Sequence, residues 1–301
     1  MNEYIKNMPA GGVLGNPPLS LKSDSTRSFN IKSGLSVKSG VWNPLDLPSF
    51  NTRWVSSHGV TESSGNVSAW APVGTKTGAG SLDQKIGTVK INHASALNGK
   101  PVISSGVTGS SDNGVLLMNN ATEKIFLDGK AHGFLVIRFP DTSDDLGYIM
   151  QTEMSGATGT SYSKGMRLYV TSSGGIRKIL FRERNASGFN FIYFSHDKFD
   201  ANNSVNPDWF ILEFSYDSGP EMIINGSAIS SSGFTSSYGA SGFPANISAG
   251  DSNSRFHLVG GNSASPDMEI AEAIFYDAKL STLEATNIRQ YLSSVYDIDV
   301  D

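Results

Sequence analysis

The stretch SRFHLVGGNSASPDMEIAEAIFYDAKLSTLEATNIRQYLSSVYDI, residues 254–298, decides the fold. It indicates a strand, a glycine pair, a loop, a second strand and a turn, and then a helix. Ser281 and Glu284 form a capping box, and Leu280 occupies the preceding staple position. The apolar residues at helical spacing are Ile288, Tyr291, Leu292 and Val295. We therefore predict a helix over 281–296, packed across one end or edge of an otherwise all-β domain.

Alternating apolar residues upstream of this stretch predict antiparallel strands. The clearest case is DWFILEFSY (208–216), where every second residue from Phe210 to Tyr216 is apolar and Glu213 and Ser215 face the other way. Further strands are predicted at GFLVIRF (133–139), GYIMQT (147–152), GMRLYVT (165–171), IRKILFRE (176–183), FNFIYFS (189–195) and EMIIN (221–225). Short turns rich in glycine, serine and asparagine separate several of them. The serine- and glycine-rich segment 226–253 is predicted to be one long loop.

Composition excludes several classes of function. Charged residues make up 17% of the 301 residues, below the roughly 25% that is usual in globular proteins. The net charge of −5 excludes a dominant role in nucleic-acid binding, which needs a strongly basic face. The chain has no cysteine, so it forms neither disulfides nor thiolate metal sites.

Residues 1–40 differ from the rest of the chain. Glycine and proline interrupt them repeatedly, and they carry a net charge of +3 against −8 for the remainder. Their cations are Lys6, Lys22, Arg27, Lys32 and Lys38, against Glu3 and Asp24. We expect an extended basic arm over 1–40 that docks on another subunit or a partner shell. A sandwich domain then occupies residues 41–301.

The expected compartment follows from two features of the sequence. The opening MNEYIKNMPAGGVLGNPP has no apolar core of the kind that secretory signal peptides carry. No stretch approaches the roughly 18 apolar residues of a membrane-spanning helix. We therefore expect a soluble protein made in the cytosol, with no membrane partner.

One cluster of carboxylates merits a catalytic hypothesis, namely Asp267-Met-Glu269-Ile-Ala-Glu272. A retaining glycosidase needs two carboxyl groups about 5–5.5 Å apart. On a regular strand Asp267 and Glu269 share a face while Glu272 points to the other face, although a β-bulge could restore a shared face. We expect Glu272 to be structural and the protein to be no enzyme. A glycosidase using Glu269 and Glu272 is the last alternative.

Other apparent motifs are weaker. Ser195-His196-Asp197 contains the residue types of a catalytic triad, but adjacent side chains on an extended chain diverge. Asp141, Asp144 and Asp145 could offer oxygen ligands to calcium, yet they match no EF-hand spacing and fit a solvated turn. The histidines show no metal-binding spacing. We therefore predict neither a metal nor a cofactor.

Glycan binding needs exposed aromatic rings together with polar groups that bind hydroxyls. The candidates in the long loop are Phe234, Tyr238, Phe243, Asn246, Asp251 and Asn253. The alternative is that these aromatic rings hold the loop on the sandwich. Trp54, Trp70 and Trp209 lie in predicted strands, and we expect all three in the core.

The C-terminal stretch resembles the end of concanavalin A-like (laminin-G-like) jelly-roll domains. The shared features are the glycine pair at 260–261, IAEAIFYD at 270–277, the Leu-Ser-x-x-Glu turn at 280–284 and Tyr-Leu at 291–292. The front of the chain is similar to the opening of this family in bacterial and bacteriophage proteins, in VWNPLDLPSFNTRWVSS (41–57), GNVSAWAPVG (65–74) and ALNGKPVI (96–103). The chain departs from the family at 104–106, where many relatives carry an aromatic residue before the glycine.

The resemblance implies a two-sheet antiparallel jelly-roll sandwich with one C-terminal helix. Such folds carry lectins, glycosidases and structural modules alike. We interpret the chain as a non-enzymatic bacteriophage virion surface protein, such as a capsid decoration (cement) protein, head fibre or tail-fibre module, that adheres to host glycans. Its expected partners are other virion proteins, bound through the arm, and further copies of itself, with a trimer favoured. The main alternative is a bacterial carbohydrate-binding lectin.

Overall fold

The computed structural model describes residues 43–75, 80–105, 114–118, 130–140, 147–153, 165–173, 176–185, 188–199, 208–237, 239, 241–244, 255–260 and 266–301. The chain divides into two units, residues 1–48 and 49–301. The described part of the first unit contains a 3-10 helix, η2 (Pro44–Asp46). Its N-cap side chain, Asn43, accepts a hydrogen bond from the backbone N–H of Leu45. The predicted arm over 1–40 lies outside the described residues.

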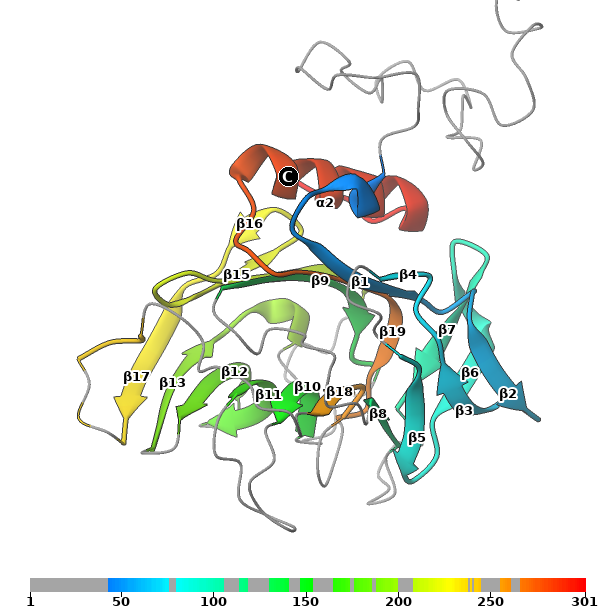
Figure 1. Ribbon diagram of the computed structural model, residues 1–301, viewed down its shortest axis with the longest axis horizontal. Helices are drawn as coiled ribbons and strands as arrows, with labels where there is room; N and C mark the ends of the chain where they lie inside the picture. Colours follow the sequence, from blue (N-terminus) through cyan, green and yellow to red (C-terminus); the bar gives the residue numbers. More distant parts are fainter. Residues whose placement is uncertain are drawn as a thin grey trace, which may run out of the picture. The chain divides into compact units, whose positions relative to one another are not determined.

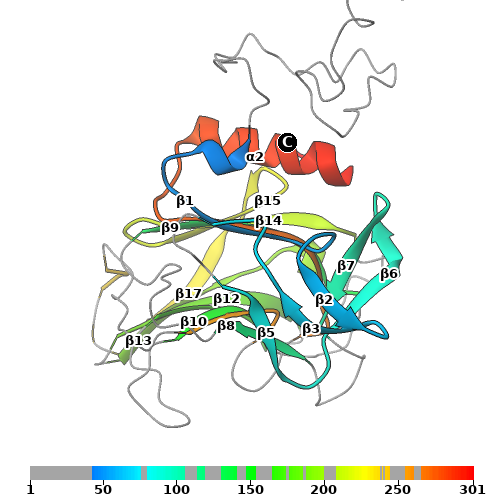
Figure 2. The same ribbon diagram turned by 45° about the vertical axis from the view of Figure 1, so that its right-hand side comes forward.

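In its described residues, the second unit is a sandwich of two antiparallel layers below one helix (Figures 1 and 2). The layer next to the helix, here the helix-side sheet, pairs in the order β16 (Ser227–Ala228), β15 (Pro220–Ile224), β14 (Phe210–Tyr216), β9 (Ala131–Arg138), β19 (Glu269–Tyr276), β1 (Phe50–Val55) and β4 (Gly74–Thr75). The predicted antiparallel sandwich is confirmed.

The second layer, here the far sheet, lies on the side away from the helix (Figure 1). It pairs in the order β17 (Ser231–Ser236), β13 (Gly188–Phe194), β12 (Ile176–Asn185), β11 (Gly165–Ser173), β10 (Gly147–Glu153), β18 (Arg255–Leu258), β8 (Val115–Met118), β5 (Leu82–Ile86), β3 (Asn66–Trp70) and β2 (Val60–Ser63). Strands β7 (Lys100–Ser104) and β6 (Lys90–Leu97) continue the hydrogen bonding from β19 to β3 and so join the two layers. A short 3-10 helix, η3 (Asp197–Phe199), follows β13.

Aromatic rings from both layers meet in the core. Trp54 of β1 stacks on Phe256 of β18 with ring centroids 5.7 Å apart, and Phe181 of β12 stacks on Tyr216 of β14 at 5.6 Å. Gly133 in β9 leaves room for this packing, because a Cβ there would lie 2.4 Å from the ring of Phe214. These contacts bury the apolar sides of both sheets against each other.

The predicted alternation in β14 is confirmed. Phe210, Leu212, Phe214 and Tyr216 belong to the core. Glu213 and Ser215 lie on the opposite face and are also buried, because the helix covers this side of the sheet. Hence every residue of the strand is buried, although only half of its residues face the other layer.

The helix α2 (Thr282–Tyr296) begins where the sequence predicts. Ser281 and Glu284 form the expected capping box, and the C-cap Asp297 adopts a left-handed conformation. The predicted position of the helix was wrong, since it lies across the outer face of the helix-side sheet and not at an end or edge (Figure 2). Buried charged groups on that face account for the position, because they need partners from the helix.

Glu272 of β19 is the first of these groups. It is fully buried, and its carboxylate accepts hydrogen bonds from Arg53 Nε at 2.7 Å and from the hydroxyl of Tyr296 at 2.7 Å. Arg53 Nη2 also donates to the hydroxyl of Tyr291 at 2.6 Å. Burial and the nearby Glu272 carboxylate raise the pKa of Tyr291 to about 12. Two tyrosines of the helix therefore stay neutral and hydrogen-bond to an ion pair of the sheet.

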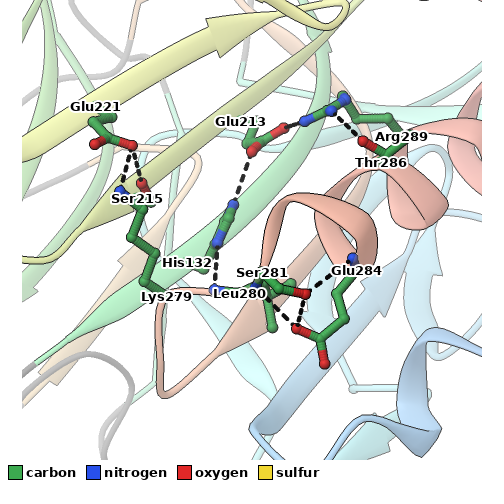
Figure 3. Close-up of polar contacts among 10 residues, drawn as sticks. All are labelled: His132, Glu213, Ser215, Glu221, Lys279, Leu280, Ser281, Glu284, Thr286 and Arg289. Carbon is green, nitrogen blue, oxygen red and sulfur yellow. Dashed lines mark hydrogen bonds and ion pairs between the residues drawn. The ribbon is translucent and has the colours of Figure 1, made fainter.

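Glu213 of β14 forms the second group (Figure 3). Its carboxylate accepts a hydrogen bond from Arg289 of the helix and contacts Nε2 of His132 at 3.0 Å. Nδ1 of His132 accepts the backbone N–H of Leu280 at 3.0 Å. Because Nδ1 accepts this hydrogen bond, it carries no proton itself. The ring proton therefore lies on Nε2, which donates a hydrogen bond to Glu213. The start of the helix is thus fixed to β9 and β14.

The predicted loop over 226–253 was wrong in part. Its first half contains β16 and β17, and β17 pairs with β13 at the edge of the far sheet. The segment looked like a loop because all six residues of β17 are serine, glycine, threonine or phenylalanine with little apolar alternation. An edge strand needs only backbone pairing on one side and no buried side chains.

The substitution Glu272→Gln should strongly destabilise the protein. The change keeps the shape of the side chain but leaves Arg53 buried without its counter-charge, so we expect a loss of about 3 kcal/mol in the free energy of unfolding. Urea denaturation measures this loss. Asp208→Asn is the control, because it breaks the exposed pair with Lys198 and should cost less than about 1 kcal/mol. Equal effects of the two variants would contradict the role given to Glu272.

Candidate functional site

The carboxylates proposed for catalysis are held in ion pairs. A β-bulge between Ile270 and Glu272 shifts the register of β19 against β9. Glu269 and Glu272 consequently share the outer face of the helix-side sheet, which corrects the opposite faces expected for a regular strand. Glu269 accepts hydrogen bonds from Arg138 and from Asn92. With Glu272 held below the helix, neither carboxylate is placed to attack a sugar.

The sequence Ser195-His196-Asp197 follows β13 and is no triad. Ser195 and Asp197 are exposed, and Nδ1 of His196 accepts the backbone N–H of Lys198 at 3.0 Å. Burial lowers the pKa of His196, while the neighbouring Asp197 acts in the opposite direction. The ring therefore caps a local turn.

The loop candidates for glycan binding divide into two groups. Phe243 packs on Phe181 and Tyr216, with ring centroids 5.9 and 6.2 Å away, and the hydroxyl of Tyr216 donates to the backbone carbonyl of Pro244. It therefore anchors its segment to the core, as the structural alternative proposed. Phe234 touches Phe243 at 5.3 Å but is 38% exposed. Tyr238, Asn246, Asp251 and Asn253 lie outside the described residues.

The predicted core position was right for two tryptophans and wrong for the third. Trp54 and Trp70 are fully buried. Trp209 precedes β14, is partly exposed, and carries the guanidinium of Arg138 5.1 Å above its ring. The alternation over 208–216 correctly predicted which residues face the core. Trp209 lies one residue before the core residue Phe210 and therefore faces the other way.

The far sheet presents aromatic rings and cations on its outer face, away from the helix. On β13 the alternate residues Ile192 and Phe194 pack toward the core, so Phe189, Phe191 and Tyr193 face outward. The outward residues of the two neighbouring strands are Arg167, Tyr169 and Thr171 on β11 and Lys178, Leu180, Arg182 and Arg184 on β12. We call this surface the aromatic–arginine face.

Rings and cations on this face contact one another directly. The rings of Phe189 and Phe191 stack at 5.7 Å, and those of Phe191 and Tyr193 meet edge to face at 5.4 Å. Arg182 lies 4.0 Å above the ring of Phe189, and Lys178 lies 5.8 Å from the ring of Tyr193. Contacts of this kind hold the side chains in place while leaving them partly exposed.

The face continues onto β10 through tyrosines. Tyr148 contacts the ring of Tyr169 at 4.8 Å, and Arg167 lies 5.3 Å above Tyr148. Burial, together with the neighbouring Tyr148, raises the pKa of Tyr169 above its ordinary value. A continuous band of aromatic and cationic side chains thus crosses β10 to β13.

These strands were predicted from the sequence, but the side chains on their outer face were not recognised as a site. The signal was present in FNFIYF, where aromatic residues occupy 189, 191 and 193 while 192 and 194 are also apolar. A strand apolar on both sides is typical either of a fully buried strand or of one with an exposed binding surface. Only the three-dimensional arrangement distinguishes these cases.

Three further expectations concern metals, membranes and the arm. Among the described residues, no group of three histidine or acidic side chains could hold a metal ion. Asp141, Asp144 and Asp145, the calcium candidates, lie outside them, as do the arm residues Lys6, Lys22, Arg27, Lys32 and Lys38. In the described part of the chain, no helix is long and apolar enough to cross a membrane.

Comparison with known proteins supports the fold. No protein-family model and no curated protein matches the sequence. One solved structure with a similar fold is the binding domain of botulinum neurotoxin DC in complex with rat synaptotagmin II, with a TM-score of 0.50 and 14% identity over 81% of this chain and 52% of that one. Another is the binding domain of botulinum neurotoxin DC in complex with SialylT, with a TM-score of 0.51 and 14% identity over 83% of this chain and 52% of that one. The chain spans about half the length of these domains. At such low identity the similarity concerns the fold alone.

We expect no glycoside hydrolysis by this protein. Both carboxylates of the candidate pair are buried and accept hydrogen bonds from arginines, so neither is open to a sugar. The assay is the release of new reducing ends from β-glucans, agars, alginates and host polysaccharide. Release that disappears in Glu269→Gln, a variant that leaves the helix contacts of Glu272 intact, would overturn this expectation.

Proposed function

We propose that this protein is a non-enzymatic carbohydrate-binding module that holds its ligand on the aromatic–arginine face. The observation that carries the proposal is the outward row Phe189, Phe191 and Tyr193 on β13. Outward residues of a sandwich are ordinarily polar. Partly exposed apolar side chains gathered on one surface instead mark a site of interaction.

The chemistry of this face suits sugars. The C–H groups of a pyranose ring make one side of it apolar, and that side packs on an aromatic ring. The guanidinium of Arg182 and the ammonium of Lys178 lie beside the rings and can donate hydrogen bonds to hydroxyl, carboxylate or ring oxygens. Flat apolar surfaces beside fixed donors are what a lectin needs to bind and orient a saccharide.

The comparisons are compatible with this function. A binding domain of similar fold was solved in complex with SialylT, and one with the protein synaptotagmin II. Folds of this kind therefore serve in binding, and the ligand must be argued from each protein's own surface. The bacterial lectin anticipated from the sequence has the same ligand chemistry and the same site in this proposal.

The substitution Phe191→Ala should weaken glycan binding about tenfold, because it removes the central ring of the row. A glycan array identifies a ligand, and calorimetry then measures its affinity for each variant. Leu283→Ala, at an exposed position on the helix, is the control and should bind as the unchanged protein does. Loss of binding in Phe234→Ala but not in Phe191→Ala would move the site to the loop and contradict the proposal.

We further propose that the module belongs to the surface of a bacteriophage particle, as a decoration or fibre protein. The support is the similarity of residues 41–57, 65–74, 96–103 and 254–298 to phage-borne domains, together with the basic arm over 1–40. In this proposal the arm docks on other virion proteins, the protein is made in the host cytoplasm, and copies associate, with a trimer favoured.

Deleting residues 1–40 should remove the protein from purified particles while leaving the thermal unfolding of the sandwich nearly unchanged. Quantitative mass spectrometry of virions carrying the full-length or the truncated chain measures the first effect, and calorimetry measures the second. Absence of the full-length protein from virions would refute the particle assignment. A large loss of domain stability on truncation would refute the independence of the arm.

A further inference from the structure

We propose that the ligand of the aromatic–arginine face is an acidic polysaccharide, bound along β12 and β13 through several successive sugar units. The inference rests on the proposed carbohydrate-binding function and specifies the charge and the length of the ligand. Three observations carry it: the sign of the charge on the face, the lack of counter-charges for two of its cations, and its extent along the strands.

The charge on this face is of one sign. The outward residues of β11, β12 and β13 whose side chains are described include Arg167, Lys178, Arg182 and Arg184 and no acidic residue. The protein as a whole has a net charge of −5. A cationic surface on an acidic protein attracts anionic ligands and keeps them in one place.

Several cations elsewhere in the sandwich are paired with carboxylates. Arg53 binds Glu272, and Arg138 binds Glu269. On the aromatic–arginine face, neither Lys178 nor Arg184 has a carboxylate partner in the described part of the chain. The Nε–H of Arg184 is moreover buried without an acceptor. A buried donor without a partner is costly, and an anionic group of a ligand would satisfy it.

The dimensions favour a polymer over a single sugar. Lys178, Arg182 and Arg184 are separated by even numbers of residues along one strand, so they project from the same side. They span about 20 Å at the usual rise of about 3.3 Å per residue. The row from Phe189 to Tyr193 runs alongside them on β13. Carboxylate or sulfate groups of a polysaccharide would reach the cations while its sugar rings pack on the aromatic row.

The test compares polysaccharides that differ in charge. Alginate and hyaluronan carry carboxylates, dextran sulfate carries sulfates, and dextran is neutral. We expect the full-length protein to bind one or more of the acidic polymers and not dextran, as measured by calorimetry and affinity electrophoresis. Binding should weaken as salt rises from about 0.05 M to about 0.5 M, because salt screens the charges.

The variant Lys178→Gln/Arg184→Gln should bind the acidic polymer at least about tenfold more weakly. The matched control is Lys130→Gln/Lys279→Gln, which removes the same total charge at exposed ion pairs with Asp217 and Glu221. The control should bind as the unchanged protein does. Equal weakening in both variants would indicate attraction to net charge alone and would overturn the inference.

Two further outcomes separate this inference from the proposed function. Salt-independent binding of neutral glycans that is lost in Phe191→Ala would overturn the acidic ligand and leave carbohydrate binding intact. Binding to no glycan, together with self-association or protein binding that is lost in Phe191→Ala, would overturn both. Oligomer length completes the test, since tetrasaccharides and longer fragments of the acidic polymer should bind more tightly than its disaccharide.

Discussion

The structure depends on two buried carboxylates that hold the helix on the sandwich. Glu213 and Glu272 lie on the outer face of the helix-side sheet, where a bare sandwich would expose them to water. Arg289, Tyr291 and Tyr296 of the helix are the groups that complete their ion pairs, directly or through Arg53. The desolvation cost of these charges makes removal of the helix unfavourable. Strands β9, β14 and β19 of the helix-side sheet thereby become a middle layer, buried on both sides.

The two sheets therefore have different roles. The helix-side sheet is engaged on one face by the helix and on the other by the core, so its side chains serve stability. Among the described residues, the far sheet packs on the core with one face, and its outer face carries the rings and cations of the aromatic–arginine face. Phe191 and Arg184 lie outside the core cluster of the described residues, which makes them informative about binding. In a sandwich of this kind, the helix determines which sheet remains free to bind a ligand.

The helix and the core face of β14 were predicted correctly, because helix caps and apolar alternation depend on residues that are close together in the sequence. Features that depend on distant partners were missed or misplaced. The bulge in β19 reflects pairing with β9 and β1, and the polar strand β17 is defined by its hydrogen bonds to β13. Trp209 is partly exposed because it lies just before β14 and out of phase with the core residues of that strand. The aromatic–arginine face went unrecognised because a strand that is apolar on both sides looks fully buried until the other layers are placed.

The bulge between Ile270 and Glu272 has a consequence for how such a chain can vary over time. The start of β19, Glu269 and Ile270, pairs with β7, whereas the residues from Glu272 onward pair with β1. The additional residue, Ala271, thus lies where β19 changes its pairing partner from β7 to β1. Losing that residue would restore regular alternation and leave Glu269 and Glu272 on the same outer face, because Ile270 and Glu272 already pair with the consecutive residues Ile137 and Val136 of β9. Comparisons of distant homologues should therefore tolerate a one-residue gap at Ala271, whereas a one-residue gap between Glu272 and Tyr276 would exchange the two faces of the strand.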